Sequence, residues 1–107
     1  MSTTTADSAI REIARRLGDA AGPSARVILF GSHATGHARP HSDLDFLVIQ
    51  PAVTDAGAEA GRLRAAVYDC RLPMDIIVIG EAEAADPSSS VIADGLLTGV
   101  VLYGHAA

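Results

Sequence analysis

Two short apolar runs on either side of a polar stretch constrain how this chain folds more than any other feature. The first run, Arg26 to Phe30, leads directly into Gly31-Ser32, and the second, Leu44 to Ile49, begins within Asp43-Leu44-Asp45. Apolar runs of this length predict strands, and side chains two positions apart on a strand point to the same face. Asp43 and Asp45 are therefore expected to project together, about 6–7 Å apart along the strand.

The polar stretch combines groups that suit phosphate with groups that suit a hard cation. Gly31 permits positive φ and close backbone approach, and Ser32 offers a hydroxyl and an amide. Two neighbouring carboxylates repel each other unless a cation lies between them, and Mg²⁺ prefers carboxylate, water and phosphate oxygens. A polyphosphate held at Gly31-Ser32 and a metal held by Asp43 and Asp45 together predict a nucleotidyl-transfer site.

The order and spacing of these residues resemble the signature of a known superfamily. Gly31-Ser32, ten further residues and then Asp43-x-Asp45 resemble the DNA polymerase beta-type nucleotidyltransferases. The short chain and the run from Ala38 to Asp45 are similar to the minimal nucleotidyltransferase (MNT) subgroup, whose members usually pair with a HEPN-domain toxin in toxin–antitoxin systems. The resemblance covers roughly Ala25 to the end of the chain. Thr35 is a departure, because the subgroup often has a phosphate-contacting arginine at that position.

Asp75 interrupts an otherwise apolar run from Met74 to Ile79. An ionised carboxylate within such a strand costs several kcal/mol unless it is paired or binds a metal. The resemblance implies that this strand lies beside the one carrying Asp43 and Asp45. It also implies that these two aspartates ligate two Mg²⁺ ions, while Asp75 ligates one ion and orients or deprotonates the attacking hydroxyl. The alternative is a structural aspartate paired with an arginine such as Arg71.

Other polar residues of the loop have less specific interpretations. Arg39 lies next to the aspartates and either reaches a phosphate or is exposed to solvent. His33, His37 and His41 recur every fourth residue, which on one helix would align them for a metal. A glycine and a proline between them make a continuous helix unfavourable. We therefore interpret the histidines as loop or substrate contacts rather than as a zinc site.

Composition narrows the class of protein. The 107 residues, 49% of them hydrophobic, predict one packed domain spanning residues 1–107. The net charge of −5 argues against a nucleic-acid-binding surface, and the absence of lysine leaves arginine, amides, hydroxyls or metal to contact phosphate. The single cysteine, Cys70, excludes an internal disulfide, is expected to be inert and fits a reducing cytoplasm. No segment reaches the ~20 apolar residues of a membrane span, and no signal-peptide pattern is present.

Periodicity predicts an α/β (α+β) fold in which helices pack on a small mixed sheet. Strands are expected at residues 26–30, 44–49, 74–79 and 100–103. On the third strand, Asp75, Ile77 and Ile79 should share one face. Segment 81–86 is expected to be loop-like. Segment 52–61 is small and flexible, and Gly57 and Gly61 weaken the prediction of a helix there.

Three helices are expected, one before the first strand and two between later strands. The first begins at Asp7 or Ser8 and ends at Gly18 or Gly22-Pro23, and its buried positions are Ile10, Ile13, Ala14 and Leu17. The second ends at Tyr68 or Asp69. The third begins at serines 88–90 and ends at Gly99, with an apolar stripe of Val91, Ile92, Leu96 and Leu97.

These features together predict a Mg²⁺-dependent nucleotidyltransferase that uses ATP. The resemblance implies transfer of AMP to a tyrosine hydroxyl of a HEPN-domain toxin, which would make the chain an enzymatic antitoxin. A domain this short lacks a second lobe, so a partner is expected to supply part of the acceptor site, and an acidic surface suits a basic partner. Two alternatives stay open. One is a non-catalytic antitoxin that masks its partner, which Thr35 favours, and the other is transfer to a small molecule, which the short length disfavours.

Overall fold

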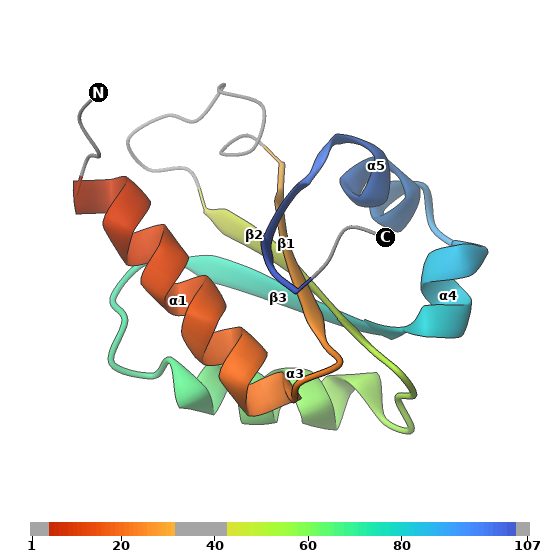
Figure 1. The fold of residues 1–107 in the computed structure, drawn as a ribbon, viewed down its shortest axis with the longest axis horizontal. Coiled ribbons are helices and arrows are strands. Elements are labelled where there is room, and N and C mark those ends of the chain that lie inside the picture. Colours follow the sequence, from red (N-terminus) through yellow and green to blue (C-terminus); the bar gives the residue numbers. More distant parts are fainter. Residues whose placement is uncertain (1–4, 32–42, 105–107) are drawn as a thin grey trace.

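The computed structural model describes residues 5–31 and 43–104, which form helices packed on a four-stranded sheet (Figure 1). In chain order the elements are α1 (Thr5–Ala21), β1 (Arg26–Phe30), β2 (Leu44–Gln50), α3 (Ala56–Ala66), β3 (Met74–Gly80), α4 (Glu81–Ala85), α5 (Ser90–Thr98) and β4 (Val100–Tyr103). The α/β fold class is confirmed, and all four predicted strands are present. No helix among these residues is long and apolar enough to cross a membrane.

The sheet is mixed, with strand order β3-β2-β1-β4. β1 runs antiparallel to both β2 and β4, whereas β2 and β3 are parallel and are connected through α3. β1 and β2 are therefore interior strands, and β3 and β4 form the two edges. The interior position of β1 agrees with its continuous apolar sequence, because both of its faces are covered.

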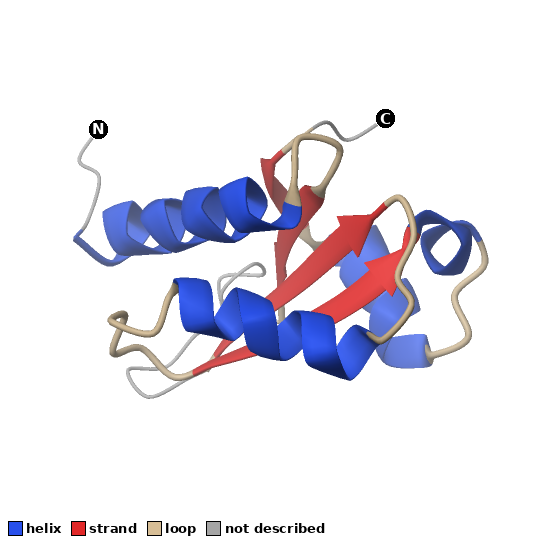
Figure 2. Cartoon of the chain, turned by 90° about the horizontal axis from the view of Figure 1, so that it is seen from below, coloured by secondary structure: helices blue, strands red, loops and turns tan. Residues whose placement is uncertain are grey.

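Helices cover both faces of the sheet (Figure 2). α1 and α3 pack on one face, where the buried cluster includes Ile13, Leu17, Val27, Phe46 and Leu63. α4 and α5 lie on the other face, over a smaller cluster of Ile28, Phe30, Leu47, Ile49 and Ile79. Successive side chains of β1 and β2 enter the two clusters in turn, because side chains along a strand alternate between its faces.

α1 is longer than predicted. Ile10, Ile13, Ala14 and Leu17 are buried, as their helical spacing predicted. The helix ends at Gly22, whose φ is +117° and whose N–H donates to the Gly18 carbonyl at 3.0 Å. The predicted stop at Gly18 is wrong. Gly18 lies inside the helix, against the Tyr103 ring, so its lack of a side chain makes room for packing.

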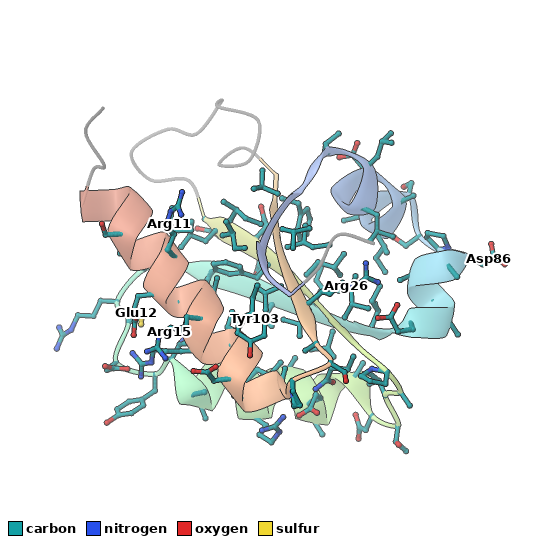
Figure 3. All side chains as sticks on the ribbon, in the orientation of Figure 1. Arg11, Glu12, Arg15, Arg26, Asp86 and Tyr103 are labelled. Atoms are coloured by element: carbon teal, nitrogen blue, oxygen red, sulfur yellow. The ribbon has the colours of Figure 1, made fainter. Side chains whose placement is uncertain are left out.

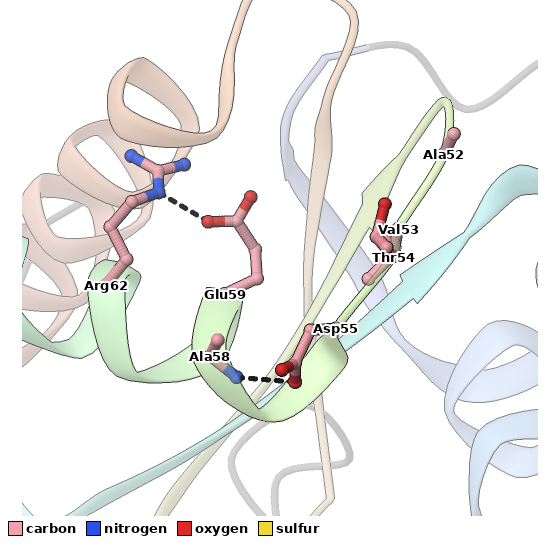
Figure 4. A pocket seen from close by; sticks show the side chains of 7 residues that line it. All are labelled: Ala52, Val53, Thr54, Asp55, Ala58, Glu59 and Arg62. Carbon is pink, nitrogen blue, oxygen red and sulfur yellow. Dashed lines mark hydrogen bonds and ion pairs between the residues drawn. The ribbon is translucent and has the colours of Figure 1, made fainter.

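α3 begins within segment 52–61, where two glycines weakened the prediction of a helix. The Asp55 side chain caps the helix by accepting a hydrogen bond from the Ala58 N–H at 3.0 Å (Figure 4). Arg62 pairs with Glu59 and donates to the Ala20 carbonyl at 2.8 Å, which attaches α3 to the end of α1. The predicted second helix is therefore present and begins at Ala56, because capping and tertiary contacts outweigh the low helix propensity of two glycines.

The region after β3 also differs from the prediction. Residues 81–85 form the short helix α4, and the Glu83 carboxylate accepts hydrogen bonds from the Ser88 N–H at 2.7 Å and hydroxyl at 2.9 Å. α5 begins with Ser89 as its cap, as predicted from the serine cluster. Its buried side is narrower than expected: Gly95 packs on Phe30, whereas Val91 and Leu97 are exposed.

Candidate active site

β2 and β3 bring two of the predicted site residues side by side. In the parallel register Asp45 is the partner of Asp75, so the usual strand spacing places their backbones about 4.8 Å apart. Asp45 shares its face with Leu47, and Asp75 shares its face with Ile77. Both of these apolar residues belong to the cluster that contacts α4 and α5. The predicted face of Asp75 is confirmed, and the two carboxylates lie on one face where both strands begin.

The exposure of these carboxylates differs from the sequence-based expectation. Asp43 and Asp75 are exposed and Asp45 is half-buried. The prediction that Asp75 is a charge within an apolar environment is wrong, because β3 is an edge strand and Asp75 is its second residue. Asp75 makes no ion pair with Arg71, although both residues are described. Within residues 5–31 and 43–104, neither a buried charge nor a structural ion pair explains Asp75.

Gly31 lies directly against Asp45. Phe30 is opposite Asp45 in the antiparallel pair of β1 and β2, so Gly31 follows at the end of β1. Its φ is +77°, and a β-carbon built there would overlap Asp45 Oδ2 and lie 3.3 Å from the carboxyl carbon. The sequence motif indicated a turn glycine for phosphate. The contact with Asp45 was not predictable from the motif, because it depends on the β1–β2 register.

The remaining predicted site residues lie in the loop. Ser32, Thr35, Arg39 and the three loop histidines fall outside the described residues. Asp43 is described and immediately precedes β2.

Two observations bear on whether the three aspartates can hold a metal ion: their chemistry and their arrangement. Asp43, Asp45 and Asp75 are carboxylates, the ligand type that Mg²⁺ prefers. Among residues 5–31 and 43–104, however, no three His, Cys, Asp or Glu side chains gather as a ready-made metal site. Carboxylates repel one another when no cation is present. The donor chemistry therefore fits Mg²⁺, and the aspartates would have to draw closer to bind it.

Few cations in the described part of the chain are available for a phosphate. Four arginines form ion pairs with nearby carboxylates: Arg15 with Glu12 and Asp19, Arg16 with Asp69, Arg26 with Glu81, and Arg62 with Glu59. Arg11, Arg64 and Arg71 make no ion pair within the same part. Figure 3 shows Glu12 and Arg15 together on α1 and Arg26 on the far side of the sheet from them.

The sequence matches the nucleotidyltransferase domain over residues 8–95, which is most of the chain. The chain belongs to this nucleotidyltransferase family. No curated protein matches it. As a nucleotidyltransferase domain, it presents Gly31, Asp45 and Asp75 at one end of its sheet, the positions that the sequence motif singled out.

Three solved structures show that the fold of this nucleotidyltransferase domain occurs elsewhere. A toxin–antitoxin complex with AMP-PNP contains a chain that is 20% identical, with a TM-score of 0.61 over 89% of this chain and 73% of that chain. A variant of the toxin–antitoxin MntA–HpeT, with two aspartates two positions apart changed to glutamate, is 18% identical, with a TM-score of 0.59 over 89% and 73%. A structure of a tri-AMPylated Shewanella oneidensis HEPN toxin with MNT antitoxin contains a chain that is 19% identical, with a TM-score of 0.54 over 89% of this chain and 70% of that chain.

Proposed function

We propose that this nucleotidyltransferase domain uses ATP and Mg²⁺ to transfer AMP to a tyrosine hydroxyl of a HEPN-domain toxin, and that it thereby acts as an antitoxin in the cytoplasm. One observation carries the proposal: Asp45 and Asp75 are register partners on one sheet face, with Gly31 against Asp45. The structures with a similar fold support the substrate and the partner, since one contains AMP-PNP and another an AMPylated HEPN toxin.

Asp43, Asp45 and Asp75 are the residues proposed to hold Mg²⁺. The glutamate substitutions in one similar structure fall on two aspartates with the same spacing as Asp43 and Asp45, which supports this assignment. When bound, two ions would neutralise charge on the triphosphate and on the attacking and leaving oxygens.

The chain's own residues bind the nucleotide and move the proton. The backbone at Gly31 and the hydroxyl and amide of Ser32 bind the terminal phosphates, and Arg39 adds the cation that the missing lysines do not supply. The acceptor hydroxyl oxygen attacks the α-phosphorus, the bond from that phosphorus to the bridging oxygen breaks, and pyrophosphate leaves. Asp75 takes the hydroxyl proton. Its exposure lets the side chain of another protein reach it.

The test uses the chain together with a purified HEPN-domain toxin. After incubation with ATP and Mg²⁺, the intact mass of the HEPN protein should rise by one or more AMP units, and its toxicity should fall. Asp45→Asn should abolish both effects. Neutralisation that proceeds equally without ATP would contradict the proposal and support masking by binding alone.

A further inference from the structure

The two tyrosines of this sequence, Tyr68 and Tyr103, differ in how accessible they are. Tyr68 is 80% exposed and lies just beyond the end of α3. Tyr103 is half-buried, its ring lies against Gly18, and its hydroxyl donates to Asp19 Oδ1 at 3.4 Å. Tyr68 is therefore the tyrosine that another molecule can reach.

The turn that carries Tyr68 is held in place by its neighbours. Val67, the residue before it, is buried in the core between the sheet and the helices. The Tyr68 N–H donates to the Ala65 carbonyl at 3.3 Å, and Arg16 Nη2 donates to Asp69 Oδ1 at 2.7 Å. The backbone of this turn is thus ordered before any partner arrives, which lowers the entropic cost of presenting the tyrosine.

Two arginines flank Tyr68. Arg64 is four residues before it and Arg71 three residues after it, and both are exposed. Arg64 Nη1 donates to the Val67 carbonyl at 3.2 Å, which keeps its side chain at the turn. The Cα atoms of Tyr68 and Arg71 are at most about 11 Å apart, within the reach of two long side chains. Neither arginine makes an ion pair within the described residues, so both guanidinium groups are available to a negative charge brought to Tyr68.

The candidate active site carries the opposite charge and lies on the other side of the sheet. Its carboxylates are Asp43, Asp45 and Asp75, and the last two share their face with the cluster under α4 and α5. α3 instead packs on the α1 face through Leu63, as the two sides of the sheet in Figure 2 show. Tyr68 directly follows α3, so the carboxylates of a second copy are a better match for it than those of its own chain.

We infer that Tyr68 is itself a site of AMP transfer, modified by the active site of a second copy of this chain; this rests on the proposed function. The Tyr68 hydroxyl oxygen bonds to the α-phosphorus of the ATP held by the second copy, the bond from that phosphorus to the bridging oxygen breaks, and pyrophosphate leaves. Asp75 of the second copy takes the hydroxyl proton. Arg64 and Arg71 attract the acidic site of that copy and neutralise the phosphodiester that forms.

The first test incubates the purified chain alone with ATP and Mg²⁺ and locates the product by intact mass and peptide mapping. The original chain should gain AMP on Tyr68, and Tyr68→Phe should gain none. Tyr103→Phe is the matched control and should gain AMP as the original chain does. Because Tyr68 is exposed, Tyr68→Phe should fold and modify a purified HEPN-domain toxin within twofold of the original rate. AMP found on another residue instead would overturn the inference.

A mixing experiment tests whether a second copy acts as the enzyme. Asp75→Asn is the acceptor, because it keeps Tyr68 and lacks the proposed proton acceptor, and Tyr68→Phe is the enzyme. Neither variant should gain AMP alone. In the mixture, Asp75→Asn should gain AMP on Tyr68, at a rate proportional to the concentration of Tyr68→Phe. An Asp75→Asn chain that stays unmodified in the mixture would overturn the inference.

Substitutions in the acceptor chain test the two arginines. Arg64→Gln and Arg71→Gln, each combined with Asp75→Asn, should slow the addition of AMP at least threefold. Arg11→Gln in the same background is the control, since Arg11 is also exposed and without an ion pair in the described part of the chain but belongs to α1. It should change the rate less than twofold. Equal rates for all three acceptors would contradict the role of Arg64 and Arg71.

The outcomes separate the inference from the function on which it rests. If the HEPN toxin gains AMP and the chain incubated alone does not, the inference is wrong and the proposed function stands. If Tyr68→Phe also stops modifying the toxin, Tyr68 acts in transfer rather than as an acceptor, and the inference is again wrong. If neither the toxin nor the chain gains AMP, the proposed function itself is wrong.

Discussion

Gly31 and Asp45 approach each other so closely that a β-carbon on Gly31 would overlap the Asp45 carboxylate. Gly31 also has a φ of +77°, a conformation that costs other residues about 1–2 kcal/mol. The glycine that ends β1 thus permits the turn and at the same time leaves space for a proposed metal ligand.

Gly31→Ala should therefore impair both stability and transfer. We expect a loss of about 1–2 kcal/mol in the free energy of unfolding from the backbone, and at least a tenfold loss of AMP transfer because Asp45 is displaced. Gly22→Ala is the matched control. Its φ is +117° and no atom lies within 4 Å of an added β-carbon, so it should lose stability and keep its activity. Equal activity of the two variants would show that Gly31 does not position Asp45.

Asp75→Asn should separate catalysis from stability. Asp75 is exposed and makes no ion pair in the described part of the chain, so the free energy of unfolding should stay within about 0.5 kcal/mol of the original value. Transfer should fall by at least ~100-fold, because the proposed proton acceptor is lost. Denaturant unfolding and AMP incorporation on one preparation give both quantities. Asp94→Asn, an exposed aspartate on α5, should change neither. A fully active Asp75→Asn protein would refute the assigned role.

The strands were predictable because each is a short, mainly apolar run in the sequence. The start of α3 was not, since Leu63 is its one buried residue and Gly57 and Gly61 lower its intrinsic helix propensity. Its formation depends on the Asp55 cap and on the contact from Arg62 to the end of α1, which connects residues far apart in the sequence.

The neighbouring positions of Asp45 and Asp75 were predictable, but their environment was not. The Asp43-x-Asp45 motif and an in-strand Asp75 pointed to the right strands, and the resemblance implied that those strands are neighbours. The exposure of Asp75 follows from the position of β3 at the sheet edge, which no local pattern encodes. The contact between Gly31 and Asp45 likewise requires the strand register.

Gly18→Ala tests the packing of α1 against β4. Alanine is the better helix former by about 1 kcal/mol, yet its β-carbon would overlap the Tyr103 ring. We expect a net loss of about 1–3 kcal/mol in the free energy of unfolding, because overpacking outweighs propensity. Gly61→Ala is the control, since that glycine is also inside a helix but has no atom within 4 Å of an added β-carbon. It should gain about 0.5–1 kcal/mol. Urea unfolding of both variants measures these changes. A Gly18→Ala variant that is more stable than the original chain would contradict the packing account.

The ion pair between Arg16 and Asp69 predicts a pH dependence of stability. The hydrogen bond from Arg16 lowers the pKa of Asp69 from its ordinary value of 3.8. A carboxyl whose pKa is lower in the folded state stabilises the fold above the unfolded pKa, and that contribution disappears as the pH falls through the folded pKa. At neutral pH, the unfolding midpoint of the original chain should therefore be higher than that of Asp69→Asn. The difference between the two midpoints should vanish as the pH falls well below 3.8.

The control for this pH dependence removes the partner. In an Arg16→Ala background, Asp69→Asn should produce little change in midpoint at any pH, because the hydrogen bond no longer exists. A pH dependence that persists there would assign the effect to another group.

The position of Asp75 on an edge strand has a consequence for how ATP is used. A carboxylate open to solvent is as accessible to water as to a tyrosine hydroxyl, so water competes with the protein acceptor for the same phosphorus. The chain alone should therefore hydrolyse ATP slowly, and the bound acceptor should suppress this side reaction by displacing water from the edge of β3. The share of ATP used for transfer rather than for hydrolysis would then depend on how well the bound acceptor protein excludes water, and not on a water-excluding pocket within the domain.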